Sequence, residues 1–230
     1  LIISEEGKEI GYAISNYFVT DHLIADTLGE ELVVVDAGER KTLKYNKGAF
    51  MVGDSLISFY DSQNNFLKTY YNGKVYEIED GLGGLPFKSM LSSDNLMAYV
   101  DRNDYLKMFY RGGLHDLSYN IASYRVGKST IAYVEGSSAE FKIEYKGEHF
   151  DVALLPPRSY KVADNLVAFV DDSESFMVFY DGEIYEISSF PPDFYKLGEN
   201  MLVYSEDGFF KVFYEGHTYS LVNYIPSNYY

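Results

Sequence analysis

The chain has 230 residues, with 19 basic and 35 acidic side chains and a formal net charge of −16. This charge repels phosphate groups, which argues against binding to nucleic acid or to an anionic membrane surface. The absence of cysteine excludes disulfides, thiolate metal sites and a cysteine nucleophile. No apolar run approaches the roughly 18 residues of a membrane-spanning helix.

The chain is rich in aromatic residues, with 24 Tyr and 16 Phe but no Trp, and this composition favours strands over helices. Taken from the N-terminus, "LIISEEGKEI" (residues 1–10) is predicted to be the last hairpin of a repeat unit, with Gly7 in its turn. Six further units follow, each with a Phe/Tyr-rich or aliphatic run that ends in a glycine. These glycines are Gly38, Gly73, Gly112, Gly147, Gly182 and Gly216, at spacings of 35, 39, 35, 35 and 34 residues.

Each unit is predicted to contain four short strands. The fifth unit shows them best, and its strands are expected at Tyr160–Val162, Leu166–Val170, Phe176–Tyr180 and Ile184–Ile187. Asp181-Gly182 is a two-residue hairpin signal, and Pro residues at 156–157, 191–192 and 226 mark the joins between units. At the C-terminus "IPSNYY" matches the start of a unit, so Tyr229 is expected to begin another one.

The second strand of the unit predicts the architecture. "LVAFV" at 166–170 is apolar on both faces, so each small sheet must be covered on both sides. Sheets stacked radially on one another form a β-propeller, whereas a linear β-solenoid is the weaker alternative. We therefore predict an all-β chain: one propeller domain over residues 1–230, with about seven small antiparallel blades, beginning and ending within a repeat.

No catalytic, cofactor-binding or metal-binding residues are predicted. The histidines His22, His115, His149 and His217 lack ligand spacing and are interpreted as exposed turn residues. Two series of acidic residues recur, one after the second strand and one before it. The first contains Asp61, Asp101, Glu135, Asp171 and Glu206, and the second contains Asp21, Asp54, Asp94, Asp164 and Glu199, with Lys128 as the exception.

Two interpretations of these acids are open. They could form rings that attract cations or a basic partner, or they could cap turns by accepting hydrogen bonds from nearby backbone N–H groups, which turn chemistry alone predicts. Acids also break the repeat at two apolar positions, Glu144 and Asp26. Each is expected to be explained by edge exposure or a salt bridge, because a buried acid without a partner costs several kcal/mol.

The segment Glu79–Pro86, "EDGLGGLP", is the one sizeable insertion. Its glycines lack the context of a phosphate-binding motif, so it is predicted to be a mobile loop between blades that can contact a partner. No nucleophile–base pair stands out in the sequence, and enzymatic activity is not expected.

The fifth unit, "YKVADNLVAFVDDSESFMVFYDGEIYEI" (160–187), resembles tandem repeats in cell-envelope β-propellers of Bacteroidota-type bacteria. This resemblance implies a non-enzymatic, protein-binding propeller in the periplasm, peripheral to the outer membrane. The expected partner is a larger envelope protein. The role that the resemblance matches best is that of a plug, which would dock on the type IX secretion translocon and close its channel. The alternative is a carbohydrate-binding or sensor propeller, which would show an exposed Tyr with a nearby acid in every blade.

Overall fold

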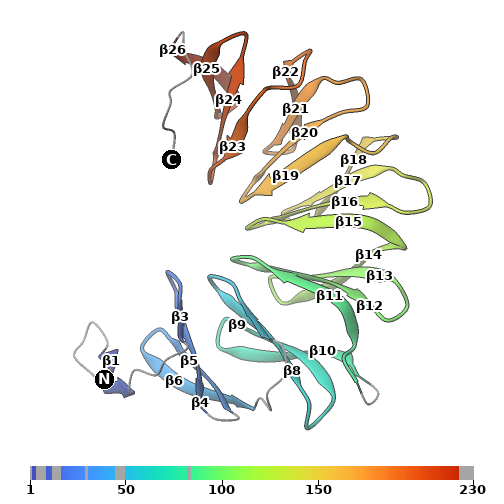
Figure 1. Cartoon of the computed structure of the whole chain (residues 1–230). Coiled ribbons are helices and arrows are strands. Elements are labelled where there is room, and N and C mark those ends of the chain that lie inside the picture. The colour runs from blue at the N-terminus through green and yellow to red at the C-terminus, as the bar shows by residue number, and fades with distance from the viewer. Residues whose placement is uncertain are drawn as a thin grey trace. The chain divides into compact units, whose positions relative to one another are not determined.

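The structure is a computed structural model that describes residues 2–3, 9–11, 17–28, 31–44, 50–81 and 84–222 (Figure 1). Within these ranges every regular element is a β-strand, as the composition and the repeat predict. They contain no helix long and apolar enough to cross a membrane. The predicted turn at Gly7 and the predicted start of a unit at Tyr229 lie outside the described residues.

The described strands form six four-stranded sheets and one two-stranded sheet, all antiparallel meanders of consecutive strands. The chain divides into two compact units, Leu1–Leu117 and Ser118–Tyr230, and β14 crosses that boundary. Below, the first unit and the second unit mean these two parts of the chain, each of which contains several repeats. The two-stranded sheet pairs β1 (Ile2–Ile3) with β2 (Glu9–Gly11). We call the strands of each larger sheet strand one to strand four, in chain order.

The first unit contains three larger sheets. Their strands are β3 (Tyr17–Val19), β4 (Leu23–Leu28), β5 (Glu31–Asp36) and β6 (Glu39–Lys44); β7 (Phe50–Val52), β8 (Leu56–Asp61), β9 (Phe66–Tyr71) and β10 (Lys74–Asp80); β11 (Phe87–Ser92), β12 (Leu96–Asp101), β13 (Tyr105–Tyr110) and β14 (Gly113–Tyr119).

The second unit contains the other three. Their strands are β15 (Ile121–Val126), β16 (Thr130–Glu135), β17 (Phe141–Tyr145) and β18 (Glu148–Ala153); β19 (Ser159–Ala163), β20 (Leu166–Val170), β21 (Phe176–Tyr180) and β22 (Glu183–Ser188); β23 (Tyr195–Leu197), β24 (Met201–Glu206), β25 (Phe209–Tyr214) and β26 (His217–Val222). The four strands predicted for the fifth unit are confirmed: β20 and β21 have the predicted bounds, and β19 and β22 are slightly longer.

The recurring glycine closes the hairpin between strands three and four. At all six sites two consecutive residues have positive φ, which is the conformation of a type I′ turn. The glycine holds the second position at φ of 78–87°, and the residue before it holds the first at 48–53°. Only two of the six first positions are Asn or Asp, namely Asn72 and Asp181. The glycine therefore carries most of the turn signal, because it adopts positive φ without steric strain.

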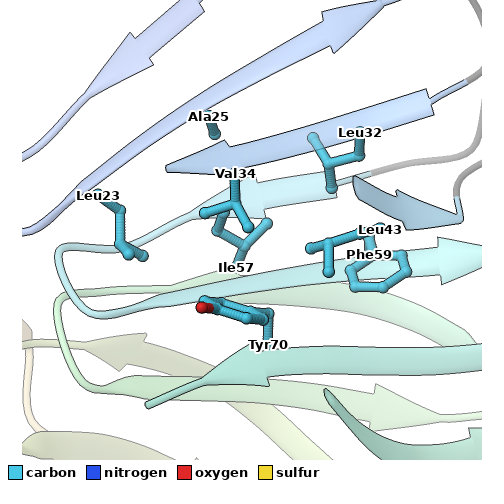
Figure 2. Close-up of a cluster of buried hydrophobic side chains, with 8 residues drawn as sticks. All are labelled: Leu23, Ala25, Leu32, Val34, Leu43, Ile57, Phe59 and Tyr70. Atoms are coloured by element: carbon cyan, nitrogen blue, oxygen red, sulfur yellow. The ribbon is translucent and has the colours of Figure 1, made fainter. Parts of the chain in front are cut away.

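Strand two is buried on both faces, and its alternate residues face different neighbouring sheets. In the first unit Ile57 and Phe59 of β8 pack with residues of the sheet β3–β6 (Figure 2), whereas Leu56 packs with the sheet β11–β14. In the second unit Val167 and Phe169 of β20 pack against the sheet β15–β18. The alternate residues of β20, including Leu166, pack against the sheet β23–β26. The predicted covering of each sheet by its neighbours is confirmed within each unit.

Neighbouring sheets approach one another most closely at the turn before strand two. A Cβ added to Gly127 would lie 2.2 Å from the backbone oxygen of Ala163 in the next sheet. Beside this contact, the N–H of Ser129 donates to the backbone oxygen of Asp164 at 3.3 Å. Gly53 has the same role in the first unit, since a Cβ there would lie 1.9 Å from the backbone oxygen of Ser93. The absence of a side chain is thus a requirement of sheet stacking at both positions.

We predict that Gly127→Ala lowers the free energy of unfolding by about 2–3 kcal/mol, because the new methyl group must push two backbones apart. The measurement is equilibrium denaturation with urea. The matched control is Gly198→Ala, at the same repeat position in the last sheet, where the nearest atom is the flexible side chain of Met201 at 3.3 Å. Equal stability losses in the two variants would contradict this account.

Candidate functional site

The acids that follow strand two cap the next loop through their carboxylates. Asp101 Oδ1 accepts hydrogen bonds from the N–H groups of Asn103 at 2.8 Å and Tyr105 at 2.9 Å. Asp61 and Asp171 accept equivalent backbone hydrogen bonds in their own sheets. These contacts satisfy donors that the loop would otherwise leave unpaired. The capping interpretation is confirmed for these three residues.

A lysine on strand three neutralises four of the five acids in this series. The pairs are Lys68–Asp61 at 2.9 Å, Lys107–Asp101 at 3.1 Å, Lys142–Glu135 at 3.0 Å, and Lys211–Glu206. In the sheet β19–β22 the lysine position is occupied by Met177, opposite Phe169. Sequence reasoning missed these lysines, although "FLK", "YLK", "FK" and "FFK" repeat visibly at the start of strand three. The carboxylates of Asp61, Asp101, Glu135 and Glu206 are therefore paired with ammonium groups of their own sheets rather than free for external cations.

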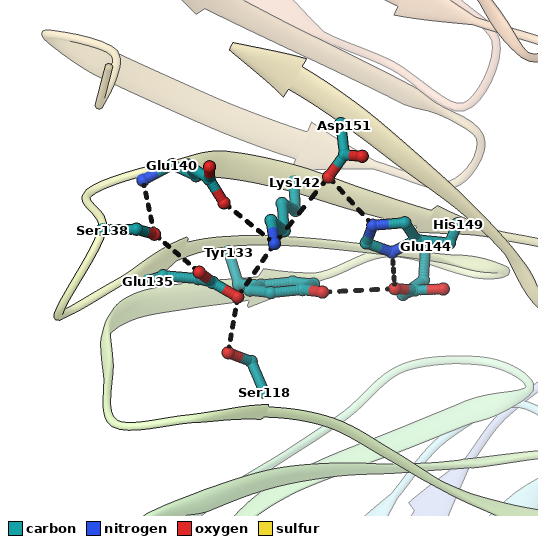
Figure 3. A network of polar contacts seen from close by, with 9 residues as sticks. All are labelled: Ser118, Tyr133, Glu135, Ser138, Glu140, Lys142, Glu144, His149 and Asp151. Atoms are coloured by element: carbon teal, nitrogen blue, oxygen red, sulfur yellow. Dashed lines mark hydrogen bonds and ion pairs between the residues drawn. The ribbon is translucent and has the colours of Figure 1, made fainter. Parts of the chain in front are cut away.

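Glu135 is the most strongly stabilised carboxylate of the series. Ser138 Oγ donates to it at 2.6 Å, Ser118 Oγ at 2.8 Å, and Lys142 Nζ lies 3.0 Å away. The hydroxyl of Ser138 contributes most, and together these donors outweigh partial burial and lower the pKa of Glu135 to about 2. Lys142 also contacts Glu140 at 3.0 Å and Asp151 at 3.7 Å, so it joins three carboxylates (Figure 3).

The acid that breaks the repeat, Glu144, is buried and belongs to the same sheet. Tyr133 donates its hydroxyl to Glu144 Oε1 at 3.2 Å, and His149 Nδ1 lies 2.5 Å from that oxygen (Figure 3). The other nitrogen of His149 lies 3.1 Å from Asp151 Oδ1. The predicted salt bridge for Glu144 is thus confirmed, whereas His149 differs from the prediction of a simple exposed turn residue.

The environment of His149 favours its protonated form. Partial burial alone would lower its pKa, but the hydrogen bonds and charges of Glu144 and Asp151 outweigh burial and raise the pKa above its ordinary value. When protonated, both ring N–H groups donate to carboxylate oxygens. A hydrolytic triad instead requires a hydroxyl or thiol on one of these nitrogens. The arrangement is therefore suited to an ion-pair network rather than to nucleophilic catalysis.

A shallow pocket of about 320 Å³ adjoins this network. Its lining residues are Glu140, Lys142, Asp151, Val152, Ala153 and Leu154. The pocket joins the polar ends of the network to an apolar wall, and it opens where strand four ends.

All four histidines are exposed, as predicted, but only His22 lies in a turn, since His115, His149 and His217 belong to β14, β18 and β26. His22 Nδ1 lies 2.5 Å from Asp54 Oδ2, and the N–H of Asp21 donates to the second oxygen of that carboxylate at 2.8 Å. Asp54, from the series before strand two, thus links a turn of the first four-stranded sheet to the next sheet. Among the described residues, no group of three His, Asp or Glu side chains is arranged to hold a metal ion.

Two other predictions need correction. Asp26 was expected at an exposed edge or in a salt bridge, but it is half-buried on β4, which is paired on both sides. It has no ion pair among the described residues, and its buried Oδ1 has no hydrogen-bond partner there. In the segment 79–86, Glu79 and Asp80 belong to β10, and Glu79 accepts hydrogen bonds from Tyr99 and Lys107. The oxygens of Gly84 and Leu85 accept hydrogen bonds from two further side chains, Tyr60 and Arg102. The described part of this segment is therefore tethered, while residues 82–83 lie outside the described ranges.

Comparison with known proteins identifies a family for nearly the whole chain. The sequence model of the 10-bladed beta propeller domain matches residues 3–230. The described residues of this chain contain six four-stranded sheets and the pair β1–β2, in line with the predicted number of about seven, whereas the family is named for ten blades. No curated protein matches the sequence.

Solved propellers resemble the chain at low sequence identity. Hsv2 of Kluyveromyces lactis has 10% identity and a TM-score of 0.44 over 86% of this chain and 72% of that protein. The N-terminal domain of Nup159 has 12% identity and a TM-score of 0.39, over 89% of this chain and 75% of that protein. The CRINKLY WD40 ectodomain of the Arabidopsis thaliana receptor kinase ACR4 has 7% identity and a TM-score of 0.44, over 88% of this chain and 80% of that protein. Likenesses this distant carry no information about function.

We predict that Lys142→Met lowers the free energy of unfolding by about 1–2 kcal/mol at neutral pH, because it leaves the half-buried Glu135 without its ammonium partner. The pKa of Glu135 is lowered in the folded state, so the stabilisation is present above its ordinary pKa and is lost as the pH falls toward 2. The difference between variant and wild type should therefore shrink in acid. The reciprocal change, Met177→Lys beside Asp171, is the control and should not lower the free energy of unfolding. A loss of stability equal to that of Lys142→Met would contradict the proposed stabilisation of these acids by a lysine on strand three.

We also predict a pH dependence from His149. Its pKa is raised on folding, so its stabilisation is fully present below the ordinary value of 6.5 and is lost as the pH rises through the folded value. His149→Gln should therefore destabilise by about 0.5–1 kcal/mol in mild acid, the range of a partly screened ion pair, and by less in alkali. Denaturation curves across this pH range measure the effect. His217→Gln, which removes an exposed histidine on β26, is the control, and identical pH profiles for both variants would refute the assignment.

Proposed function

Because the chain belongs to the 10-bladed beta propeller domain family, we propose that it is a non-enzymatic, protein-binding propeller of the bacterial cell envelope. The specific role that we propose is a plug in the periplasm, peripheral to the outer membrane. The plug docks on the type IX secretion translocon and closes its channel while no substrate is engaged. This specific role rests on the resemblance of the repeat at 160–187, whereas the general protein-binding role rests also on the surface chemistry.

The observation that carries the proposal is the internal pairing of the polar side chains. Lysines neutralise four of the five acids after strand two, and both ring nitrogens of His149 contact carboxylates. The side chains that remain available to a partner include large apolar ones on connectors, such as Leu154 and Phe190. Exposed apolar groups on a rigid β framework suit protein docking, because little order has to be gained on binding.

The carbohydrate-binding alternative required an exposed Tyr at a repeated position of every blade. The Tyr residues that repeat on strand two are buried, namely Tyr99, Tyr133 and Tyr204, and at the repeated positions beside the turn glycine the exposed Tyr214 and Tyr219 belong only to the sheet β23–β26. The exposed ones occupy different positions in their sheets, as Tyr105 and Tyr119 illustrate. This distribution provides no repeated sugar-stacking platform, and it favours the protein-binding proposal.

We predict that deletion of the gene leaves the translocon channel open and makes the outer membrane permeable to small solutes. Uptake of a small hydrophilic dye into the periplasm measures this effect, and complementation with the wild-type gene is the control. The purified protein should also co-purify with an outer-membrane complex. Normal permeability in the deletion strain would eliminate the plug role, and a protein that retains no partner would eliminate the protein-binding role as well.

A further inference from the structure

Two connectors of the second unit hold large apolar side chains in solvent. Leu154 and Leu155 follow β18 and are 79% and 51% exposed, and Phe190 follows β22 and is 73% exposed. Both connectors continue with two consecutive prolines, at 156–157 and 191–192. Equivalent positions of consecutive sheets thus carry the same kind of surface feature. Exposed apolar side chains gathered in this way are typical of interaction sites.

The strand register places both connectors on one edge of the second unit. Ala153 at the end of β18 pairs with Phe141, which follows the loop 136–140. Ser188 at the end of β22 pairs with Phe176, which follows the loop 171–175. The two sheets share a hydrophobic core, and packed sheets lie about 10 Å apart. We call the edge formed by residues 136–140, 154–158, 171–175 and 189–194 the connector edge.

Hydrogen bonds and prolines hold the connector edge in place. The N–H of Arg158 donates to the backbone oxygen of Val170 at 2.8 Å, and its guanidinium pairs with Glu174. The N–H of Phe190 donates to Ser188 Oγ at 3.2 Å. Because the backbone is held in this way and the prolines restrict it further, the apolar side chains are presented with a small entropic cost of binding.

The charge of the connector edge specifies the chemistry of its partner. The edge contains five carboxylates and the single guanidinium of Arg158, which is already paired with Glu174. The adjoining pocket is lined by Glu140, Lys142 and Asp151 beside the apolar wall of Val152 and Leu154. The ammonium group of Lys142 is shared among the carboxylates of Glu135, Glu140 and Asp151, so negative charge is in excess there. A lysine or arginine side chain matches both features, because its aliphatic stem covers apolar surface while its charged end meets carboxylates.

We infer that the connector edge is a docking surface for a protein segment in which apolar side chains alternate with lysine or arginine. This inference rests on the proposed protein-binding function and names the class of partner. Phe190 and Leu154 are the apolar anchors, and Glu140 and Asp151 receive a cationic side chain in the pocket. The same acidic charge disfavours an anionic lipid surface as the occupant.

The test uses the whole chain and two short fluorescent peptides of equal length. In one peptide Leu and Phe alternate with Lys, and in the other Glu replaces every Lys. Fluorescence anisotropy should show that the Lys peptide binds at least about tenfold more tightly, with an affinity that falls as salt rises. The double variant Leu154→Ser/Phe190→Ser should weaken binding by about tenfold or more, as expected for anchor residues.

Matched controls separate the surface from the fold. Ile184→Ser removes a similarly apolar side chain, 44% exposed on β22 but away from the connector edge, and should leave binding unchanged. Glu140→Gln/Asp151→Asn should weaken binding of the Lys peptide and flatten its salt dependence. Urea denaturation of each variant confirms that it is folded. Equal affinity for both peptides, no binding of either, or unchanged binding by the double variant would overturn the inference.

A second measurement distinguishes failure of the connector-edge inference from failure of the proposed protein-binding function. Wild type and the Leu154→Ser/Phe190→Ser variant are each recovered from native cells, and the proteins that remain bound are compared. The inference predicts that the variant loses the partner. A partner retained equally by both proteins leaves protein binding intact but overturns the connector edge. A wild-type protein that retains no partner overturns the proposed function itself.

Discussion

The rest of the structure depends on the burial of strand two from both sides. A strand such as β8 sends Ile57 and Phe59 toward one neighbouring sheet and Leu56 toward the other, so neither face can remain in water. An isolated small sheet would therefore be unstable, and stability arises between sheets as well as within them. This requirement explains why an apolar second strand recurs in the repeat: each sheet must present one apolar face to the sheet before it and another to the sheet after it.

Close stacking also determines where charged groups can lie. Asp61 and Asp101 are at most 3% exposed, and a buried carboxylate is costly unless it is paired. Lysine on strand three meets this need, because its aliphatic stem runs along the sheet while its ammonium group reaches the acid. In the sheet with Met177 the equivalent acid, Asp171, is half-buried and accepts a hydrogen bond from the backbone N–H of Ser175 in its loop. The two most buried acids of the series thus both have a lysine partner, and the half-buried Glu135 and Glu206 have one as well.

The sequence predicted the fold well because its signals are local. A glycine at positive φ marks each hairpin, and an apolar strand two implies cover on both sides, so the strands of the unit at 160–187 could be placed closely. The ion pairs were harder to predict because they depend on register. Glu144 and His149 oppose each other only because a two-residue turn at Lys146-Gly147 separates their strands. The sequence marked Asp26 as a break in the repeat, but its contacts depend on the register with Tyr17 and Val33 on the two neighbouring strands and could not be predicted.

The sheet β15–β18 shows how a repeat can be specialised without loss of its fold. Glu144 stands where other units have Phe, and its burial is tolerated because Tyr133 and His149 both contact it. Asp151 then connects His149 to Lys142, and it also lines the pocket beside Leu154. The unit that departs most clearly from the repeat in its core is thus the one whose surface combines charge with exposed apolar side chains. The network therefore runs from the buried Glu144 through His149 to Asp151 at the pocket, and it connects the core of this sheet to the side chains of the proposed docking surface.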